Sequence, residues 1–148
     1  MPNPNVPLGT LNRLKASVVW NDFPALNITA SFLGREGIRL APEGVVTLAI
    51  PAMSGVVQSP EPYQLVRVTL SLLKSQGLAD LYKAQMELNT LLGQCTVRPD
   101  VAENAGLGPF QFDNCAIDTI GELQFSGENA AYPVVLNATY YVNSQLWN

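Results

Sequence analysis

The chain has 148 residues, 47% of them hydrophobic and only 14% charged, with a net charge of −4. Soluble domains usually carry about 25% charged residues, so a monomer of this composition would leave much of its surface neutral, as surfaces that contact partners are. The absence of histidine excludes Ser-His-Asp and Cys-His catalysis and the HExxH zinc site, and we expect one domain in an obligate assembly, not an enzyme.

The basic residues and cysteines narrow the function classes further. Eight basic residues scattered along the chain predict no patch that would grip nucleic-acid phosphates. Cys95 and Cys115 form no CxxC motif and are predicted to be two small, buried, reduced side chains. The first nine residues have no basic start and no apolar stretch, which predicts no signal peptide. Apolar runs of only a few residues predict no membrane anchor.

The N-terminal half reads as an arm followed by short strands. Residues 1–9 hold three prolines and two asparagines and are predicted to form an extended arm, with a single domain over 10–148. Alternation of apolar and polar residues predicts strands over 14–20, 27–33, 38–41 and 45–50. The segment 51–62 is rich in Pro, Ser and Gly, and is predicted to be a loop whose apolar side chains dock onto another surface.

The C-terminal half contains the strongest strand and one helix. Over 65–73 a strand is predicted, because Val66, Val68, Leu70 and Leu72 alternate with Arg67, Thr69, Ser71 and Leu73. A 3.6-residue apolar period predicts a helix over about 76–92, capped by Ser75 and stopped at Gly93. Further strands are expected over 95–97, 110–117 with a bulge near Asn114, 120–125 and 134–143. Seven or eight short strands, one helix and no βαβ rhythm predict a mainly β fold, a β-sandwich or barrel with one appended α-helix.

The densest group of carboxylates is Asp113, Asp118 and Glu122. Two carboxylates can form a glycosidase pair or bind a divalent metal. The spacing matches no loop that folds around an ion, and such charges are usually a solvated strand edge. We therefore expect no catalytic residue, no metal and no cofactor.

The order of elements is informative together with the last strand, which reads Ala-Ala-Tyr-Pro-Val-Val-Leu-Asn-Ala-Thr-Tyr-Tyr-Val over 130–142. From about Thr10 onward the chain resembles the tail tube proteins of contractile-tailed bacteriophages, a family related in fold to the secretion-system tube protein Hcp. The resemblance implies a structural virion protein, assembled in the host cytoplasm, whose hexameric rings share a continuous β-barrel and stack into a hollow tail tube. DNA would pass through this tube during ejection without sequence-specific binding. The implied partners are further copies of the chain, the tail sheath, baseplate and tail-terminator proteins, and a tape measure protein in the lumen.

The resemblance also assigns residues to surfaces. The lumen would be lined by the polar sides of two strands, namely Asn27, Thr29, Ser31 and Thr47. Contacts between rings would involve Arg35, Glu36, Arg39, Glu43, Met53, Val56 and Val57. The helix would face the sheath through Asp80, Lys83 and Glu87. Because the family's lumen is commonly acidic, either Glu43, Glu61 or Asp118 supplies the acidic lining or the assigned facing is shifted by one residue, which would exchange the two faces of each strand.

Three alternatives remain open from the residues. A non-viral Hcp-like secretion tube or a tube-terminator ring would use the same fold but differ in whether the rings stack. A β-sandwich carbohydrate-binding module would present an exposed Trp20 or Trp147 beside carboxylates. A carboxylate hydrolase would depend on Asp118 and Glu122.

Overall fold

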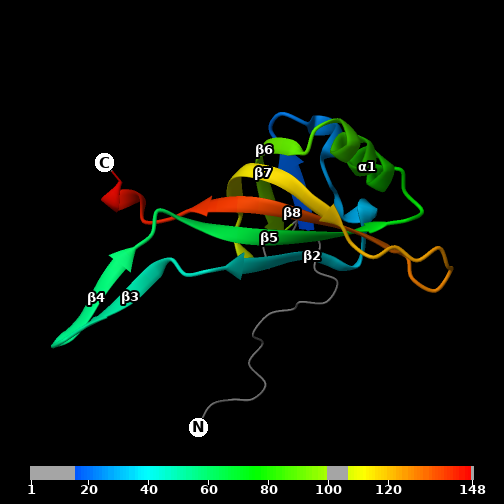
Figure 1. Cartoon of the computed structure of the whole chain (residues 1–148). Coiled ribbons are helices and arrows are strands. Elements are labelled where there is room, and N and C mark those ends of the chain that lie inside the picture. The colour runs from blue at the N-terminus through cyan, green and yellow to red at the C-terminus, as the bar shows by residue number, and fades with distance from the viewer. Residues whose placement is uncertain (1–15, 100–106, 148) are drawn as a thin grey trace, which may run out of the picture.

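The computed structural model describes residues 16–99 and 107–147, except for the side chains of Ala30 and Arg35, and in this part the protein is mainly β with one α-helix (Figure 1). This confirms the predicted fold class. Six strands form one antiparallel sheet in the order β1-β6-β7-β8-β5-β2, and β3 and β4 form a separate hairpin. The strands are β1 Ala16–Trp20, β2 Leu33–Glu43, β3 Thr47–Ala52, β4 Gly55–Pro60, β5 Tyr63–Leu73, β6 Leu91–Pro99, β7 Phe110–Ile120 and β8 Ala131–Tyr141, and the helix is α1 Leu78–Leu88.

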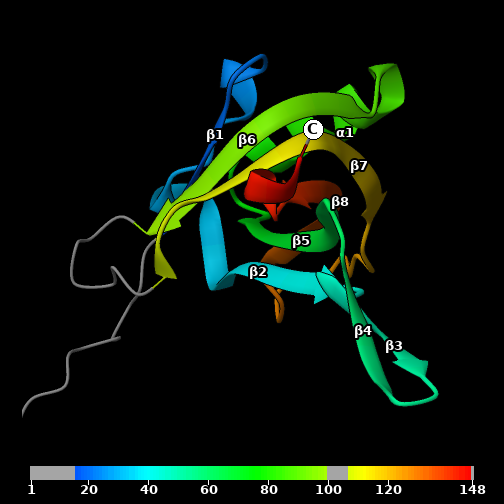
Figure 2. The same cartoon turned by 90° about the vertical axis from the view of Figure 1, so that its left-hand side faces the viewer.

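The six-stranded sheet curls around the hydrophobic core as a half-barrel (Figure 2). Along β5 the alternation works as predicted, since Val66, Val68, Leu70 and Leu72 are at most 4% exposed. Register shifts on both sides of β7 mark β-bulges, which increase the local twist of a sheet. The predicted bulge near Asn114 is confirmed, and this residue has a left-handed φ of 51°.

Helix α1 covers the core on one side of the half-barrel. Its residues Leu78, Ala79 and Tyr82 are buried. The Tyr82 hydroxyl accepts a hydrogen bond from Trp20 Nε1 at 2.9 Å and donates one to the carbonyl oxygen of Leu26 at 2.7 Å. These bonds satisfy buried polar groups that would otherwise destabilise the fold.

The predicted helix was too long at both ends. The N-cap is Gly77, without a side-chain capping bond, so Ser75 does not cap α1. At the other end Asn89 has extended backbone, and its Oδ1 accepts a hydrogen bond from the Leu91 amide. The chain then enters β6, in which Leu92 is fully buried, and Gly93 lies in a bulged strand with φ 82° instead of stopping a helix.

Two predicted strands are wrong. The segment 27–33 contains the 3-10 turn Ala30–Phe32 and a single bridge between Val18 and Ile28, because its polar side chains bond locally. Asn27 Oδ1 accepts from the Trp20 amide at 2.8 Å. Strand 120–125 is also absent, since β7 continues to Ile120 and residues 121–125 have no regular structure.

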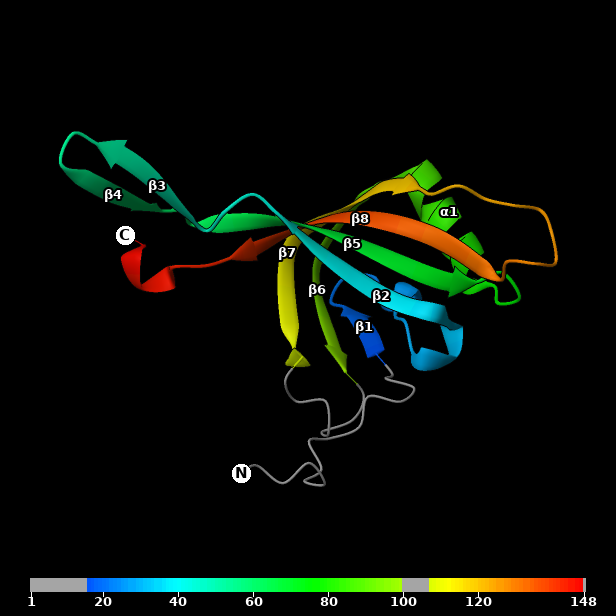
Figure 3. The same cartoon turned by 90° about the horizontal axis from the view of Figure 1, so that it is seen from below.

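The segment predicted as a strand followed by a loop is a β-hairpin. Proline 51 does not end β3, which runs to Ala52, and residues 55–60 form β4 instead of a loop. Figure 3 shows the hairpin projecting away from the curled sheet. The predicted N-terminal arm, residues 1–9, lies outside the described residues.

Candidate functional site

The β3–β4 hairpin carries an apolar surface that the described part of the molecule leaves open. All of β3 and all of β4 except Ser59 are exposed. The register pairs Ile50 with Val57, so these residues share one face with Leu48 and, by alternation, Val46. We call Val46, Leu48, Ile50 and Val57 the hairpin's apolar face; their exposed fractions lie between 38% and 56%. Met53 at the tip is fully exposed.

The hairpin lacks the charges that usually protect an exposed strand, but it carries prolines. Residues 45–60 contain no charged side chain, although natural proteins commonly protect strand edges with charges. Pro51 and Pro60 remove backbone donors from the two strands and hinder edge-to-edge pairing. A partner would therefore cover this hairpin through its apolar face better than through its edges.

A second apolar surface lies at the open side of the half-barrel, between β2 and β6. It is a cavity of about 430 Å³, within the usual size range of binding pockets. Phe110 and Phe112 stack with ring centroids 6.2 Å apart, and Tyr140 meets both edge-on at 5.8 Å. We call this the apolar groove; its walls include Ile38, Leu40, Val97, Phe110, Phe112 and Tyr140.

The face of the sheet opposite the core carries charged and polar side chains where β2, β5, β8 and β7 lie side by side, with the exposed Leu65 between Glu43 and Thr139. Arg67 lies at its centre, with Nε 2.9 Å from Glu43 Oε1 and Nη1 2.8 Å from Asp118 Oδ2. The hydrogen bond and charge of Glu43, together with the charge of Asp118, raise the pKa of Arg67. We call Glu43, Arg67, Asp118, Asn137 and Thr139 the polar face. One arginine between two carboxylates leaves this charged group with one net negative charge.

The residues predicted to line a lumen lie in two separate places. Asn27, Thr29 and Ser31 belong to the segment with the 3-10 turns, where the Thr29 and Ser31 hydroxyls are 2.9 Å apart. Thr47 begins β3 of the hairpin. Of the two strands on which this prediction depended, only the one that begins at Thr47 is present. The lumen-facing role of these residues stays a prediction.

The residues predicted for ring contacts divide between β2 and the hairpin. Glu36, Arg39 and Glu43 are exposed on β2, and the side chain of Arg35 lies outside the described residues. Met53, Val56 and Val57 are exposed around the hairpin tip. Sequence reasoning missed Leu48 and Ile50, whose signal was the charge-free run over residues 45–60, and it missed Arg67, for which no local signal exists.

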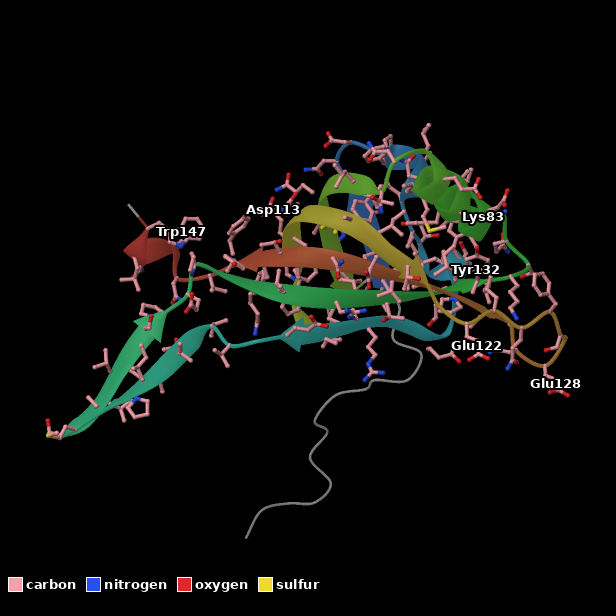
Figure 4. All side chains as sticks on the ribbon, in the orientation of Figure 1. Lys83, Asp113, Glu122, Glu128, Tyr132 and Trp147 are labelled. Atoms are coloured by element: carbon pink, nitrogen blue, oxygen red, sulfur yellow. The ribbon has the colours of Figure 1, made fainter. Side chains whose placement is uncertain are left out.

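The helix residues predicted to face a sheath are all exposed on α1. Lys83 Nζ lies 3.7 Å from Glu87 Oε1, a spacing typical of an exposed i,i+4 pair. Tyr132 of β8 lies beside α1, as Figure 4 shows with Lys83. Burial raises the pKa of Tyr132, with smaller contributions from the charges of Asp80 and Glu87, while Lys83 opposes them.

The carboxylates and aromatic residues of the alternative functions are not gathered into one site. Asp118 pairs with Arg67, while Glu122 lies on the loop after β7, near the end of the molecule opposite Trp147 (Figure 4). Among the described residues no group of three His, Cys, Asp or Glu side chains could hold a metal ion. Trp20 is 2% exposed, so it cannot stack on a sugar, whereas Trp147 is 48% exposed against Tyr141.

The two cysteines are neighbours in the core. Cys95 Sγ and Cys115 Sγ are 3.7 Å apart, and both thiols are free and buried, as predicted. The hydrogen bond with Cys115 and burial raise the pKa of Cys95. This thiol therefore stays protonated near neutral pH, where a protonated thiol is a poor nucleophile.

Comparison of the sequence with known protein families and with characterised proteins finds no match. Within residues 16–99 and 107–147, no helix has both the length and the apolar character needed to cross a membrane.

Proposed function

We propose that this chain is a structural subunit that associates with copies of itself into rings that stack as a tube. The observation that carries the proposal is the projecting, charge-free β3–β4 hairpin with its exposed apolar face. A two-stranded hairpin is only marginally stable in water by itself. Covering it with another subunit would bury four aliphatic side chains that are now 38–56% exposed, so each would contribute up to about half of the roughly 1.5–3 kcal/mol that full burial of such a side chain supplies.

The apolar groove is the surface that a neighbouring hairpin would fill. The hairpin points away from the sheet (Figure 3), so its tip and the groove of the same chain are held apart. The two surfaces are different, and contacts between different patches of identical chains are head-to-tail. Such contacts generate closed rings or open helical filaments, depending on the rotation between copies.

The resemblance to bacteriophage tail tube proteins supplies the finer part of the proposal. Rings would be hexameric, and the tube would conduct DNA in a virion tail, with a tape measure protein inside and sheath, baseplate and tail-terminator proteins around it. We assign the polar face to the bore. Its charged group has a net negative charge, with the arginine engaged by two carboxylates, and would repel phosphates more than bind them.

Purified full-length chain tests the self-association. We expect particles much larger than 16.0 kDa by light scattering after size exclusion, and rings or filaments by negative-stain microscopy. A compact monomer at high concentration would contradict the proposal. Closed rings that do not stack would instead favour a terminator or Hcp-like ring.

Val57→Lys and Gln58→Lys form a matched pair for the apolar face. These neighbours on β4 point to opposite faces of the hairpin, and both are exposed. We expect the charge at Val57 to abolish association and the same charge at Gln58 to weaken it much less. Equal effects would show that the apolar face is not the contact.

Cysteine cross-linking tests whether the groove receives the hairpin. Copies carrying Met53→Cys are mixed with copies carrying Leu107→Cys, an exposed residue at the groove, and oxidised with diamide. We expect a disulfide-linked dimer. Copies carrying Gln76→Cys, an exposed site away from the groove, serve as the control partner, and equal cross-linking to them would contradict the docking.

A further inference from the structure

Asn143 connects the end of the chain to both roots of the hairpin. Val46 directly precedes β3 and Glu61 directly follows β4. The Asn143 side-chain amide, Nδ2, donates to the carbonyl oxygen of Glu61 at 2.7 Å and to that of Val46 at 3.2 Å. Because the Glu61 amide also donates to the Val46 carbonyl at 2.9 Å, the three residues form a closed set of hydrogen bonds at the hairpin base.

The segment around Asn143 is itself held against the end of β8. Asn143 has φ 55° and ψ 36°, a left-handed conformation that asparagine tolerates better than most residues. Its carbonyl accepts from the Leu146 amide at 2.9 Å. Trp147 Nε1 donates to the Val142 carbonyl at 2.9 Å, and its ring meets that of Tyr141 edge-on at 5.8 Å. Figure 4 shows Trp147 at the same end of the molecule as the hairpin.

The hairpin needs such a support because its own strands do not pack on the body. Nearly all residues of β3 and β4 are exposed, and the connection from β2 contains Gly44 with φ 81°. Gln64 Nε2 donates to the Gly44 carbonyl at 3.3 Å, and the Val142 amide donates to that of Pro62 at 3.0 Å. Each of these two bonds holds one connection, whereas Asn143 holds both together.

We propose that Asn143 is a positioning residue that fixes the direction in which the β3–β4 hairpin projects from the body. Its two donated hydrogen bonds oppose rotation about either connection. The importance of this direction for assembly rests on the proposed function. If only chains with a correctly directed hairpin can dock, the apparent dissociation constant rises in inverse proportion to their fraction.

The direction can be measured as a distance in the full chain. Spin labels are placed at Met53→Cys on the hairpin tip and at Gln111→Cys, exposed on β7, and labelled chains are diluted into unlabelled chains so that only distances within one chain are read. Cys95 and Cys115 are at most 2% exposed, and an unsubstituted chain treated with label checks that they do not react. We expect one narrow distance distribution.

Asn143→Gly is the decisive variant because glycine keeps the left-handed backbone and removes both hydrogen bonds. We expect a broadened or shifted distribution, with the midpoint of thermal unfolding little changed. Asn143→Asp keeps the side-chain size but replaces the donor by an oxygen facing two carbonyls, and should shift the distribution further. Asn114→Gly is the matched control, since Asn114 is a left-handed asparagine on β7 of the body with φ 51°.

An unchanged distribution in Asn143→Gly, an equal change in Asn114→Gly, or a broad distribution in the unsubstituted chain would each overturn the positioning role. These outcomes are independent of self-association. A chain that stays monomeric but whose hairpin loosens in Asn143→Gly would contradict the proposed function and support the positioning role. A chain that assembles but whose hairpin does not loosen in Asn143→Gly would overturn the positioning role and leave the proposed function standing.

Discussion

The six-stranded body and the β3–β4 hairpin contain the same kinds of aliphatic residue, but the body buries them and the hairpin leaves them exposed. In the body, Leu70 and Val134 are fully buried, whereas in the hairpin Leu48 and Val57 are about half exposed. Both regions alternate along their strands, so the local pattern is similar. The difference lies in what covers the apolar face. In the body it is covered by the facing strands of the curled sheet and by α1. The body can therefore be stable as a single chain, while the hairpin presents surface suited to a partner.

The strongest test of this difference is Leu70→Ala in the body. Leu70 is fully buried in the core, and removing its side chain should lower the free energy of unfolding by about 2–5 kcal/mol. Urea denaturation followed by tryptophan fluorescence, to which the buried Trp20 contributes, measures the loss. A loss below about 1 kcal/mol would mean that the core collapses around the cavity, and that the body is less rigidly packed than its burial indicates.

Tyr82→Phe should have the next largest effect. The substitution leaves Trp20 Nε1 and the Leu26 carbonyl, both now bonded to the Tyr82 hydroxyl, without that partner. We expect a loss of about 1–3 kcal/mol in the free energy of unfolding. Tyr63→Phe, at an exposed tyrosine, is the control and should change stability little.

The same substitution should alter the pH dependence of stability. Burial raises the pKa of Tyr82, so the phenol keeps its proton in the folded chain at pH values where the unfolded chain, with a tyrosine pKa of about 10, releases it. The contribution is complete below about pH 10 and is lost as the pH rises further. Unfolding is measured between about pH 8 and 11.5, which spans the range in which tyrosine titrates. Over this range the free energy of unfolding should decline less in Tyr82→Phe than in the unsubstituted chain. An equal decline would show that Tyr82 does not contribute.

Gly93→Ala should cost less than either core change. Gly93 has φ 82°, and an added Cβ would lie 3.0 Å from Asp22 Oδ2. A left-handed backbone costs a residue with a Cβ about 1–2 kcal/mol, and thermal unfolding measures the loss. Gly127→Ala, at a site with open space around it, is the control. Similar effects at both positions would contradict the strained geometry of the β6 bulge.

Leu48→Ala in the hairpin should have the smallest effect on the single chain, within about 0.5 kcal/mol, as is usual for exposed positions. Its effect should appear instead in self-association, measured by sedimentation velocity as a higher concentration needed for assembly. A loss of stability equal to that of Leu70→Ala would show that the hairpin packs on the body of its own chain, and would remove the difference between the two regions.

Sequence reasoning succeeded where local pattern and long-range packing agree. Strand β5 and the Val134–Ala138 part of β8 are strands as predicted, and the residues that alternation places on one side of each, such as Leu70 and Leu136, are buried in the core. It failed where short polar side chains satisfy the backbone locally, as Asn27 does for Trp20. It also failed at Leu92, where burial in a strand overrides the helical period of the preceding residues.

The candidate surfaces were only partly predictable for the same reason. The exposed apolar residues around Met53 could be recognised because they interrupt a Pro- and Gly-rich segment. The ion pairs of Arg67 with Glu43 and Asp118 could not be predicted, because these residues come from three strands and meet only through the sheet register. The role proposed for Asn143 depends on carbonyls 97 and 82 positions away, which no local pattern encodes.

The strands that flank the hairpin are themselves neighbours. Glu43 at the end of β2 pairs with Leu65 of β5, and β5 begins at Tyr63, which pairs with β8, so residues 44–62 leave the sheet and return to the adjacent strand. The hairpin is in effect an elongated connection that could be exchanged for a tight turn without breaking a core contact. The fold of the body therefore does not depend on the length or sequence of the hairpin. A chain shortened in this way would supply the folded body in a form suited to crystallisation or to solution NMR.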